Sequence, residues 1–492
     1  MADDAEDRLL REIADKGGVS VAAFGVERAL SLAFSIGATA AFGAAVYGYL
    51  SVFRRARTVL EELLTGLTSG HSRTIPRWET AGQRSVLFAS LLLVVGFALS
   101  LGVGVVALSG RIPAHTLFAP RHRTALILFA VGLVPTVCLS YAASALRAYR
   151  QVRRSVFVSR VVRPGAVVVG GGAAAAAGAG GLTAVWLAVV AALATAAVAV
   201  VATLPRLVPL AATLDRPAAV RDFLAYAAST SLVGLLGASQ RQAAFLLTAV
   251  ALSPVSAGLF SLSLLVAGVV RWPLKGINRA LSAVVAELHG GGESAAVGRL
   301  YRRTSRVAAF TALPIAVVVT PHYRPLLRAV SPAYKAGLVV LPLAVAGQFL
   351  AVVAGSNGLV LLMTDNERPT AALHAVHAAV VLPVMVALTR WHGVVGLGAA
   401  YAFSLCFNNV TELLLLRRLE GIRLLTAGHA ALAGLCCAGV LVGLPLVGRT
   451  PVAVSVPAVT ALAVGIAVFA HRVVLSPADR RAVRVMLRPD RR

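Results

Sequence analysis

The chain has 492 residues, of which 58% are apolar and only 13% are charged. A soluble globular protein carries about twice that share of charged residues. The composition therefore excludes a soluble globular protein. The net charge of +26 is spread over many short loops rather than gathered in one patch, which argues against nucleic-acid binding and indicates arginines at a membrane surface.

A helix that crosses a bilayer needs about 20 mostly apolar residues, and this rule predicts an all-α membrane protein with fourteen spans. The expected spans are residues 19–42, 46–68, 85–108, 124–146, 156–179, 182–204, 223–248, 255–279, 306–328, 337–362, 370–389, 394–416, 425–447 and 452–474. The second is the weakest, because charged residues follow its apolar start. The segment 1–18 is acidic and amphipathic, unlike a signal peptide.

The distribution of Lys and Arg predicts the orientation of the chain. With fourteen spans both termini lie on one side, and the loops of that side hold several times more Lys and Arg than the loops of the other. Positive loops stay in the cytoplasm. We therefore expect both termini in the cytoplasm, with the chain in the plasma membrane.

A short internal match suggests two lobes. GYLSV at residues 48–52 is similar to GLFSL at residues 258–262, each at the start of an expected span; a chance match of small residues is the alternative. A true repeat predicts two six-helix lobes related by a pseudo-two-fold axis along the membrane normal. The expected divisions are an N-lobe at 19–204, a cytoplasmic linker at 205–222, a C-lobe at 223–416, two additional spans within 425–474 and a basic cytoplasmic tail at 475–492.

Several motifs resemble one family. KGGVSVAAFGVERALSLAF begins at Lys16, the turn FGAAVYG covers residues 42–48, and RTIPR follows at residues 73–77. In the second half, SPVSAGLFSLSLLVAGVVRWPLKGINRAL begins at Ser253. Together these resemble the polysaccharide-biosynthesis (O-antigen, Wzx-type) flippases of the multidrug/oligosaccharidyl-lipid/polysaccharide exporter (MOP) superfamily. The turn departs from the family pattern, because Phe42 replaces the usual leucine.

The resemblance implies an alternating-access transporter. It would flip a polyprenyl phosphate- or pyrophosphate-linked oligosaccharide across the cytoplasmic membrane. The nucleotide-binding pattern GxxxxGK[ST] is absent from the sequence, so no cofactor is expected. The implied partners are this lipid-linked oligosaccharide, membrane lipids, and a glycan polymerase or glycosyltransferases of the same pathway.

Interior cations are the candidate substrate ligands, because arginine stays charged and binds phosphate oxygens through two donors. The candidates are Arg28, Arg54, Arg57, Arg241, Arg271 and Lys275. Arg54 and Arg57 fall with Glu61 at i, i+3 and i+7, so we expect these three residues on one face of a helix. The alternatives are ion pairs that only hold helices together, and arginines in the cytoplasmic headgroup region. Arg160 is expected in a cytoplasmic loop with little role.

Three glutamates could balance these cations or couple transport to an ion: Glu27, Glu61 and Glu412. Interhelical hydrogen bonding is the simpler interpretation for Glu412. His374 and His377 share a helix face, but two histidines alone do not make a metal site, so no metal is expected.

Two rival functions remain open. A multidrug or cation-coupled exporter of the same superfamily would need a carboxylate site in the membrane. Interior cations outnumber interior acids here, which favours an anionic substrate instead. A membrane glycosyltransferase would place carboxylates in a sizeable outer loop, and the expected outer loops contain neither Asp nor Glu. We therefore expect a transporter rather than an enzyme.

Overall fold

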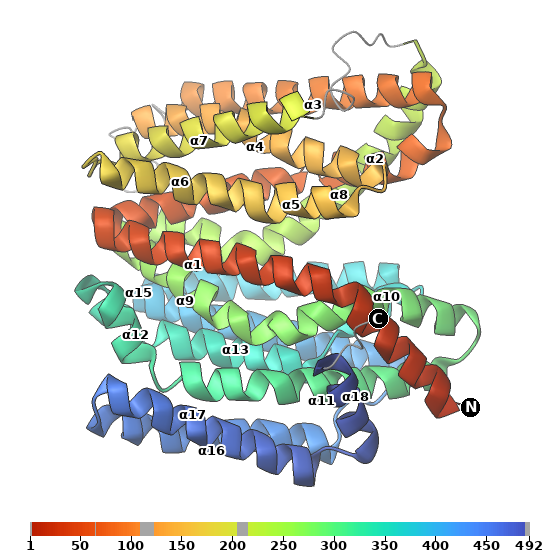
Figure 1. Ribbon diagram of the computed structural model, residues 1–492, viewed down its shortest axis with the longest axis vertical. Helices are drawn as coiled ribbons and strands as arrows, with labels where there is room; N and C mark the ends of the chain where they lie inside the picture. Colours follow the sequence, from red (N-terminus) through yellow and green to blue (C-terminus); the bar gives the residue numbers. More distant parts are fainter. Residues whose placement is uncertain (1, 64, 109–122, 204–214, 488–492) are drawn as a thin grey trace. The chain divides into compact units, whose positions relative to one another are not determined.

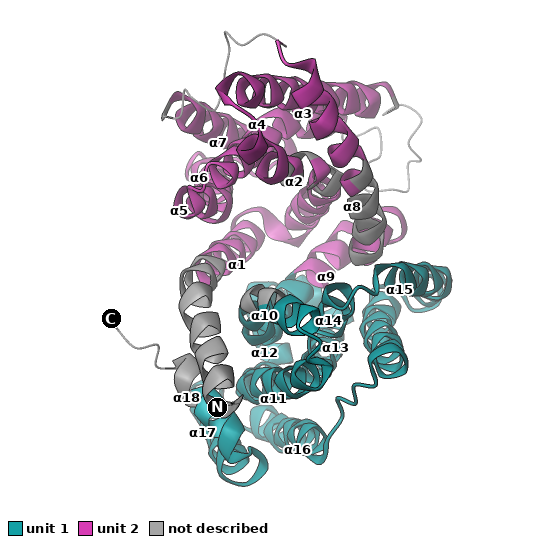
Figure 2. Cartoon of the chain, turned by 90° about the vertical axis from the view of Figure 1, so that its right-hand side faces the viewer, with its two compact units in different colours: residues 1–22, 262–492 teal, residues 23–261 magenta. Residues whose placement is uncertain are grey.

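The computed structural model describes residues 2–63, 65–108, 123–203 and 215–487, and over these residues its regular structure is entirely helical (Figure 1). The chain divides into two compact units, residues 23–261 and residues 1–22 with 262–492 (Figure 2). We call them the 23–261 unit and the 262–492 unit. The two-lobe repeat and the lobe boundaries stay predictions.

The 23–261 unit contains most of α1 and the helices up to the first part of α9. In chain order they are α1 (Ala2–Leu63), α2 (Thr65–Thr74), η1 (Ile75–Arg77), α3 (Thr80–Leu108), α4 (Arg123–Ala148), α5 (Val152–Phe157), η4 (Val158–Val162), α6 (Arg163–Ala176), α7 (Leu182–Thr203), α8 (Pro217–Ala251) and α9 (Pro254–Ala267).

The 262–492 unit contains the remaining helices. They are η6 (Gly268–Arg271), α10 (Trp272–Gly290), α11 (Ser294–Val319), α12 (Tyr323–Val330), η7 (Pro332–Gly337), α13 (Val340–Ala354), α14 (Asn357–Met363), α15 (Glu367–Glu420), α16 (Ala427–Arg449), α17 (Val452–Phe469), η8 (Ala470–Val474) and α18 (Pro477–Leu487).

Among the described residues, ten helices are long and apolar enough to cross a bilayer, or up to eleven if the bent pair α11–α12 forms one span. α15 holds two expected spans, and α1 holds one expected span and most of the next; a glycine interrupts each of these two helices. Gly43 in α1 has φ 81° and ψ 162°, and Gly393 in α15 has φ 57° and ψ −135°. The all-α membrane architecture is confirmed, and the count of fourteen spans stays a prediction.

Small residues let the helices of the 23–261 unit approach closely. A Cβ added at Gly170 on α6 would lie 2.6 Å from the Cα of Val189 on α7. A Cβ added at Gly66 on α2 would lie 1.9 Å from the carbonyl oxygen of Ala227 on α8. Such close contacts stabilise helix pairs in lipid, where burial of apolar surface adds little. The glycine-rich segment 170–181 is therefore packed helix at its start.

The core of the 262–492 unit is arranged around α11. This helix packs against α10, α13, α16, α17 and α18, and α15 packs against α13 and α14. Gly439 allows a close approach of α16 to α11, because an added Cβ would lie 2.9 Å from a methyl group of Val317.

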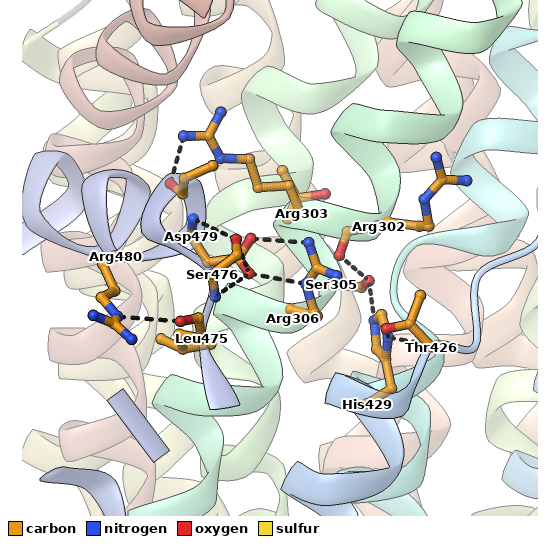
Figure 3. Close-up of polar contacts among 12 residues, drawn as sticks. Arg302, Arg303, Ser305, Arg306, Thr426, His429, Leu475, Ser476, Asp479 and Arg480 are labelled. Atoms are coloured by element: carbon orange, nitrogen blue, oxygen red, sulfur yellow. Dashed lines mark hydrogen bonds and ion pairs between the residues drawn. The ribbon is translucent and has the colours of Figure 1, made fainter. Parts of the chain in front are cut away.

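The C-terminal segment, expected as a basic tail, contains the docked helix α18 (Figure 3). Ser476 and Asp479 cap its first turn, each accepting a hydrogen bond from the other's backbone N–H. Asp479 is almost fully buried and lies 3.1 Å from Arg306 on α11. Ala482 and Val483 pack against Val307. The cap and the ion pair hold α18 against α11.

Candidate substrate-binding site

The second half of α1 carries the charged face that the spacing predicts. Arg54, Arg57 and Glu61 are three and seven residues apart, so they share one side of the helix. The Nε of Arg57 lies 3.4 Å from Oε1 of Glu61, and their side chains are 10% and 16% exposed. Arg55 points elsewhere, with its guanidinium carbon 4.0 Å from the ring centroid of Phe245.

Two further arginines reach this face from the helix formed by α5, η4 and α6. Nη1 of Arg163 lies 2.8 Å from Oε2 of Glu61 and 3.4 Å from the hydroxyl of Ser140 on α4. Arg160 forms an ion pair with Glu27 on α1. The turn Val158–Val162 is π-helical, a local widening that is frequent at functional sites.

Arg54 and Arg28 complete the group. The guanidinium of Arg54 lies 5.3 Å from the ring centroid of Phe34. It also interacts electrostatically with Arg28, Glu27, Arg163 and Tyr47. We call Arg28, Arg54, Arg57, Arg160 and Arg163 the arginine cluster. It contains five positive charges against the two carboxylates of Glu27 and Glu61, an excess of three.

The arginine cluster belongs to helices that are long and apolar enough to cross a bilayer. Arg28, Arg54 and Arg57 belong to the candidate span Gly25–Val59, and Arg160 and Arg163 belong to the candidate span Val152–Ala176. Charges in such segments are costly, and they normally face a protein interior or a polar cavity. A phosphate group would offset this excess charge and accept hydrogen bonds from several guanidinium groups.

The guanidinium group of Arg57 has hydrogen-bond donors without acceptors. Its Nε and Nη1 are buried, and among the described residues they have no hydrogen-bond partner. Its ion pair with Glu61 is longer than a good charge-assisted hydrogen bond. Buried donors without acceptors are rare in native proteins and often mark a site that a ligand or water completes. Arg57 can therefore donate to an incoming anion.

The structure corrects the expectation for Arg160. Arg160 was expected in a cytoplasmic loop, although it also falls near the start of the expected span 156–179. In the structure, helix covers residues 152–163 without interruption, and Arg160 pairs with Glu27. Arg163 was missed as a candidate for the same reason. A signal was available, because Arg160 and Arg163 are three residues apart, the same spacing as Arg54 and Arg57.

The remaining candidates lie elsewhere. Arg271 ends η6, and Lys275 lies in the first turn of α10, both in the 262–492 unit. Arg241 is in α8, but its side chain lies outside the described residues. The assignment of these cations to a substrate site stays a prediction.

Glu412 on α15 lies in a second polar group, in the 262–492 unit. Its Oε1 is 3.2 Å from Nε2 of His374, on the other arm of α15. The nearby His377 lies within 3.2 Å of the carbonyl and hydroxyl oxygens of Ser404. Among the described residues no group of three or more His, Cys, Asp or Glu could hold a metal ion.

Comparison with solved structures identifies the fold. The inward-closed lipid II flippase MurJ superposes with a TM-score of 0.72 at 9% identity, covering 91% of this chain and 96% of that one. An inward-facing multidrug resistance MATE family transporter of the MOP superfamily has a TM-score of 0.68 at 13% identity, covering 80% and 94%.

The chain has the MOP superfamily transporter fold. A third MOP structure, from Pyrococcus furiosus, has a TM-score of 0.54 at 15% identity, covering 84% of this chain and 98% of that one; the reverse polarity of its binding pocket suggests a different function for that transporter. No protein-family model and no curated protein sequence matches the chain. The MOP fold includes both a lipid flippase and multidrug resistance transporters, so substrate class must be argued from the site.

Proposed function

We propose that this protein flips a polyprenyl phosphate- or pyrophosphate-linked oligosaccharide across the cytoplasmic membrane by alternating access. The arginine cluster binds the anionic head group, and Glu27 and Glu61 neutralise part of the cluster when no substrate is bound. The observation that carries the proposal is Arg57, whose buried Nε and Nη1 lack hydrogen-bond partners among the described residues, in a group with three excess positive charges.

The charge of the site favours an anionic substrate. A cationic drug would meet five arginines and gain only two carboxylates, both already in ion pairs. Phosphate or pyrophosphate would instead bind several guanidinium groups at once, and each charge-assisted hydrogen bond contributes about 1.5–3 kcal/mol. The resemblance of the sequence motifs to O-antigen flippases supports the same substrate class.

A small-molecule exporter of the same superfamily is the second candidate. The buried carboxylate of Glu412, only 6% exposed, favours this alternative because it could bind a cation. The solved transporters that share the fold include a multidrug resistance protein of the MATE family. The two candidates differ in which charge the transported molecule carries.

Loss of the gene separates the two candidates. For a flippase, mass spectrometry of lipid extracts from a deletion strain should find the intact lipid-linked oligosaccharide accumulated, and protection from an externally added glycosidase should place it in the cytoplasmic leaflet. Surface glycan should fall in parallel, and reintroduction of the wild-type gene should reverse both effects. Normal surface glycan without accumulated precursor would reject the flippase proposal and support the exporter.

A further inference from the structure

A membrane-spanning helix of the 262–492 unit is broken in its middle. α13 ends at Ala354 and α14 begins at Asn357, within the single candidate span Val340–Met363. Between them Gly355 has φ 74° and ψ −150°, which interrupts the helical hydrogen bonds. In the bilayer a broken backbone is tolerated only where it is buried in protein or lines a polar cavity. In transporters such breaks often contribute to ion or substrate sites.

Polar groups from three other helices, two side chains and one backbone carbonyl, form hydrogen bonds with the broken segment. The hydroxyl of Tyr301 on α11 donates a 2.7 Å hydrogen bond to the carbonyl of Ala354. Asn357 donates a 3.0 Å hydrogen bond to the carbonyl of Asn409 on α15. The hydroxyl of Ser356 donates to Asn278 on α10. The break is therefore held open by specific partners and is not a simple kink.

The carboxylate of Glu412 lies directly against this break. A Cβ added at Gly358, in the first turn of α14, would be 2.9 Å from Oε1 of Glu412. The same oxygen lies 3.2 Å from Nε2 of His374, and the two side chains are 6% and 37% exposed. The carboxylate of Glu412 is therefore buried against the break, and its partner His374 is the less buried of the two.

Other titratable groups near the pair come from α15, α11 and α10. On α15, His377 interacts electrostatically with both His374 and Glu412. On α11, Tyr301 interacts electrostatically with Glu412. α13 and α14 contain no charged residue, and on α10 Lys275 lies one turn before Asn278. Among the described residues, His374 is the cationic group within hydrogen-bonding distance of Glu412.

We propose that Glu412 and His374 bind the proton that drives the transport cycle. In the loaded form the imidazolium of His374 faces the carboxylate, and the pair is neutral. When the proton leaves His374 for water, the buried carboxylate keeps an uncompensated charge, which is costly in a membrane interior. The two forms therefore favour different conformations. This inference rests on the proposed transport function and names the ion coupled to it.

The test uses the full chain in proteoliposomes that contain a pH-sensitive dye and a fluorescent polyprenyl diphosphate-linked sugar. Transport by the wild type should be accompanied by proton flux, and an imposed pH gradient should increase the rate. Glu412→Gln and His374→Gln should each abolish the proton flux and the response to the gradient, while exchange of the labelled lipid between leaflets persists. Glu412→Asp should retain both responses. Glu287→Gln is the matched control, because Glu287 is an exposed carboxylate on α10.

The outcomes separate this inference from the proposed function. Flipping without proton flux in the wild type, or flipping that follows a sodium gradient instead, would overturn the proton site while leaving the flippase intact. Proton flux that accompanies a cationic dye but not the labelled lipid would retain the proton site and reject the flippase. If Glu412→Gln does not purify as a folded protein, His374→Gln decides, because its imidazole is partly exposed.

Discussion

Nη1 of Arg163 on α6 lies 2.8 Å from Oε2 of Glu61 on α1, on the opposite oxygen of the carboxylate from Arg57. One glutamate therefore holds two arginines that are more than a hundred residues apart in the chain. This arrangement positions both guanidinium groups before substrate arrives, so less conformational entropy is lost on binding.

Arg163→Ala should reduce transport of a lipid-linked sugar by at least about tenfold, because it removes one charge-assisted donor to the head group and leaves Arg57 as the partner of Glu61. The measurement is the initial flipping rate in proteoliposomes at equal protein content. Arg153→Ala is the control on the same helical segment, since Arg153 is exposed. Equal losses in both variants would mean that general surface charge, and not the arginine cluster, controls the rate.

The pair of Glu27 and Arg160 gives a second prediction. Arg160→Ala should lower transport, in contrast to the expectation from the sequence, because it leaves Glu27 partly buried without this partner. The exchanged double variant Glu27→Arg with Arg160→Glu should recover part of the loss if the pair only holds α1 against η4. No recovery, with normal folding by size-exclusion chromatography, would indicate that Arg160 itself binds the head group.

The sequence predicted the helical membrane architecture well, because apolar runs of span length are strong signals. It also predicted the shared face of Arg54, Arg57 and Glu61, which depends only on helical spacing. It missed Arg160 and Arg163 because a run of arginines next to a span is usually a cytoplasmic loop. The contact between Glu412 and His374 depends on the fold of α15 about Gly393, which local spacing does not reveal.

Gly43 provides a test of the kink in α1. Its φ of 81° and ψ of 162° belong to a backbone region that is essentially restricted to glycine, so Gly43→Ala should lower the free energy of unfolding by about 1–3 kcal/mol. No atom lies within 4 Å of the added Cβ, so the cost comes from the backbone alone. The measurement is thermal unfolding in detergent.

The control for Gly43 is Gly37 in the same helix. A Cβ at Gly37 also meets no atom within 4 Å, but its backbone is helical, so Gly37→Ala should stabilise the protein by up to about 1 kcal/mol. Opposite signs for the two substitutions would establish the kink. Stabilisation by both would show that α1 is a continuous helix.

His71 on α2 should make stability depend on pH. Its ring nitrogens hydrogen-bond to the hydroxyls of Ser90 and Ser144, and its ring stacks on Phe223. Burial, with a smaller contribution from Arg147, lowers the pKa of His71 to about 3. The unfolded state, with a pKa near 6.5, therefore binds the proton first, and stability falls as the pH drops from about 6.5 towards 3.

At pH 5 this loss should be about 2 kcal/mol relative to pH 7. His71→Gln should remove that part of the pH dependence, whereas His392→Gln, at an exposed position on α15, should leave it unchanged. The measurement is the free energy of unfolding in detergent across this pH range. An identical pH profile for wild type and His71→Gln would show that His71 is not buried in neutral form.

Binding of the anionic head group of a lipid-linked oligosaccharide by the arginine cluster is central to the proposed function. Its most direct test is the flipping rate of a fluorescent polyprenyl diphosphate-linked sugar in proteoliposomes that contain the wild type, Arg57→Ala or Arg153→Ala. We predict rapid flipping by the wild type and Arg153→Ala, and a loss of at least about tenfold in Arg57→Ala. Absence of flipping by a folded wild-type protein that transports a cationic dye, or equal rates in all three proteins, would contradict the proposed function.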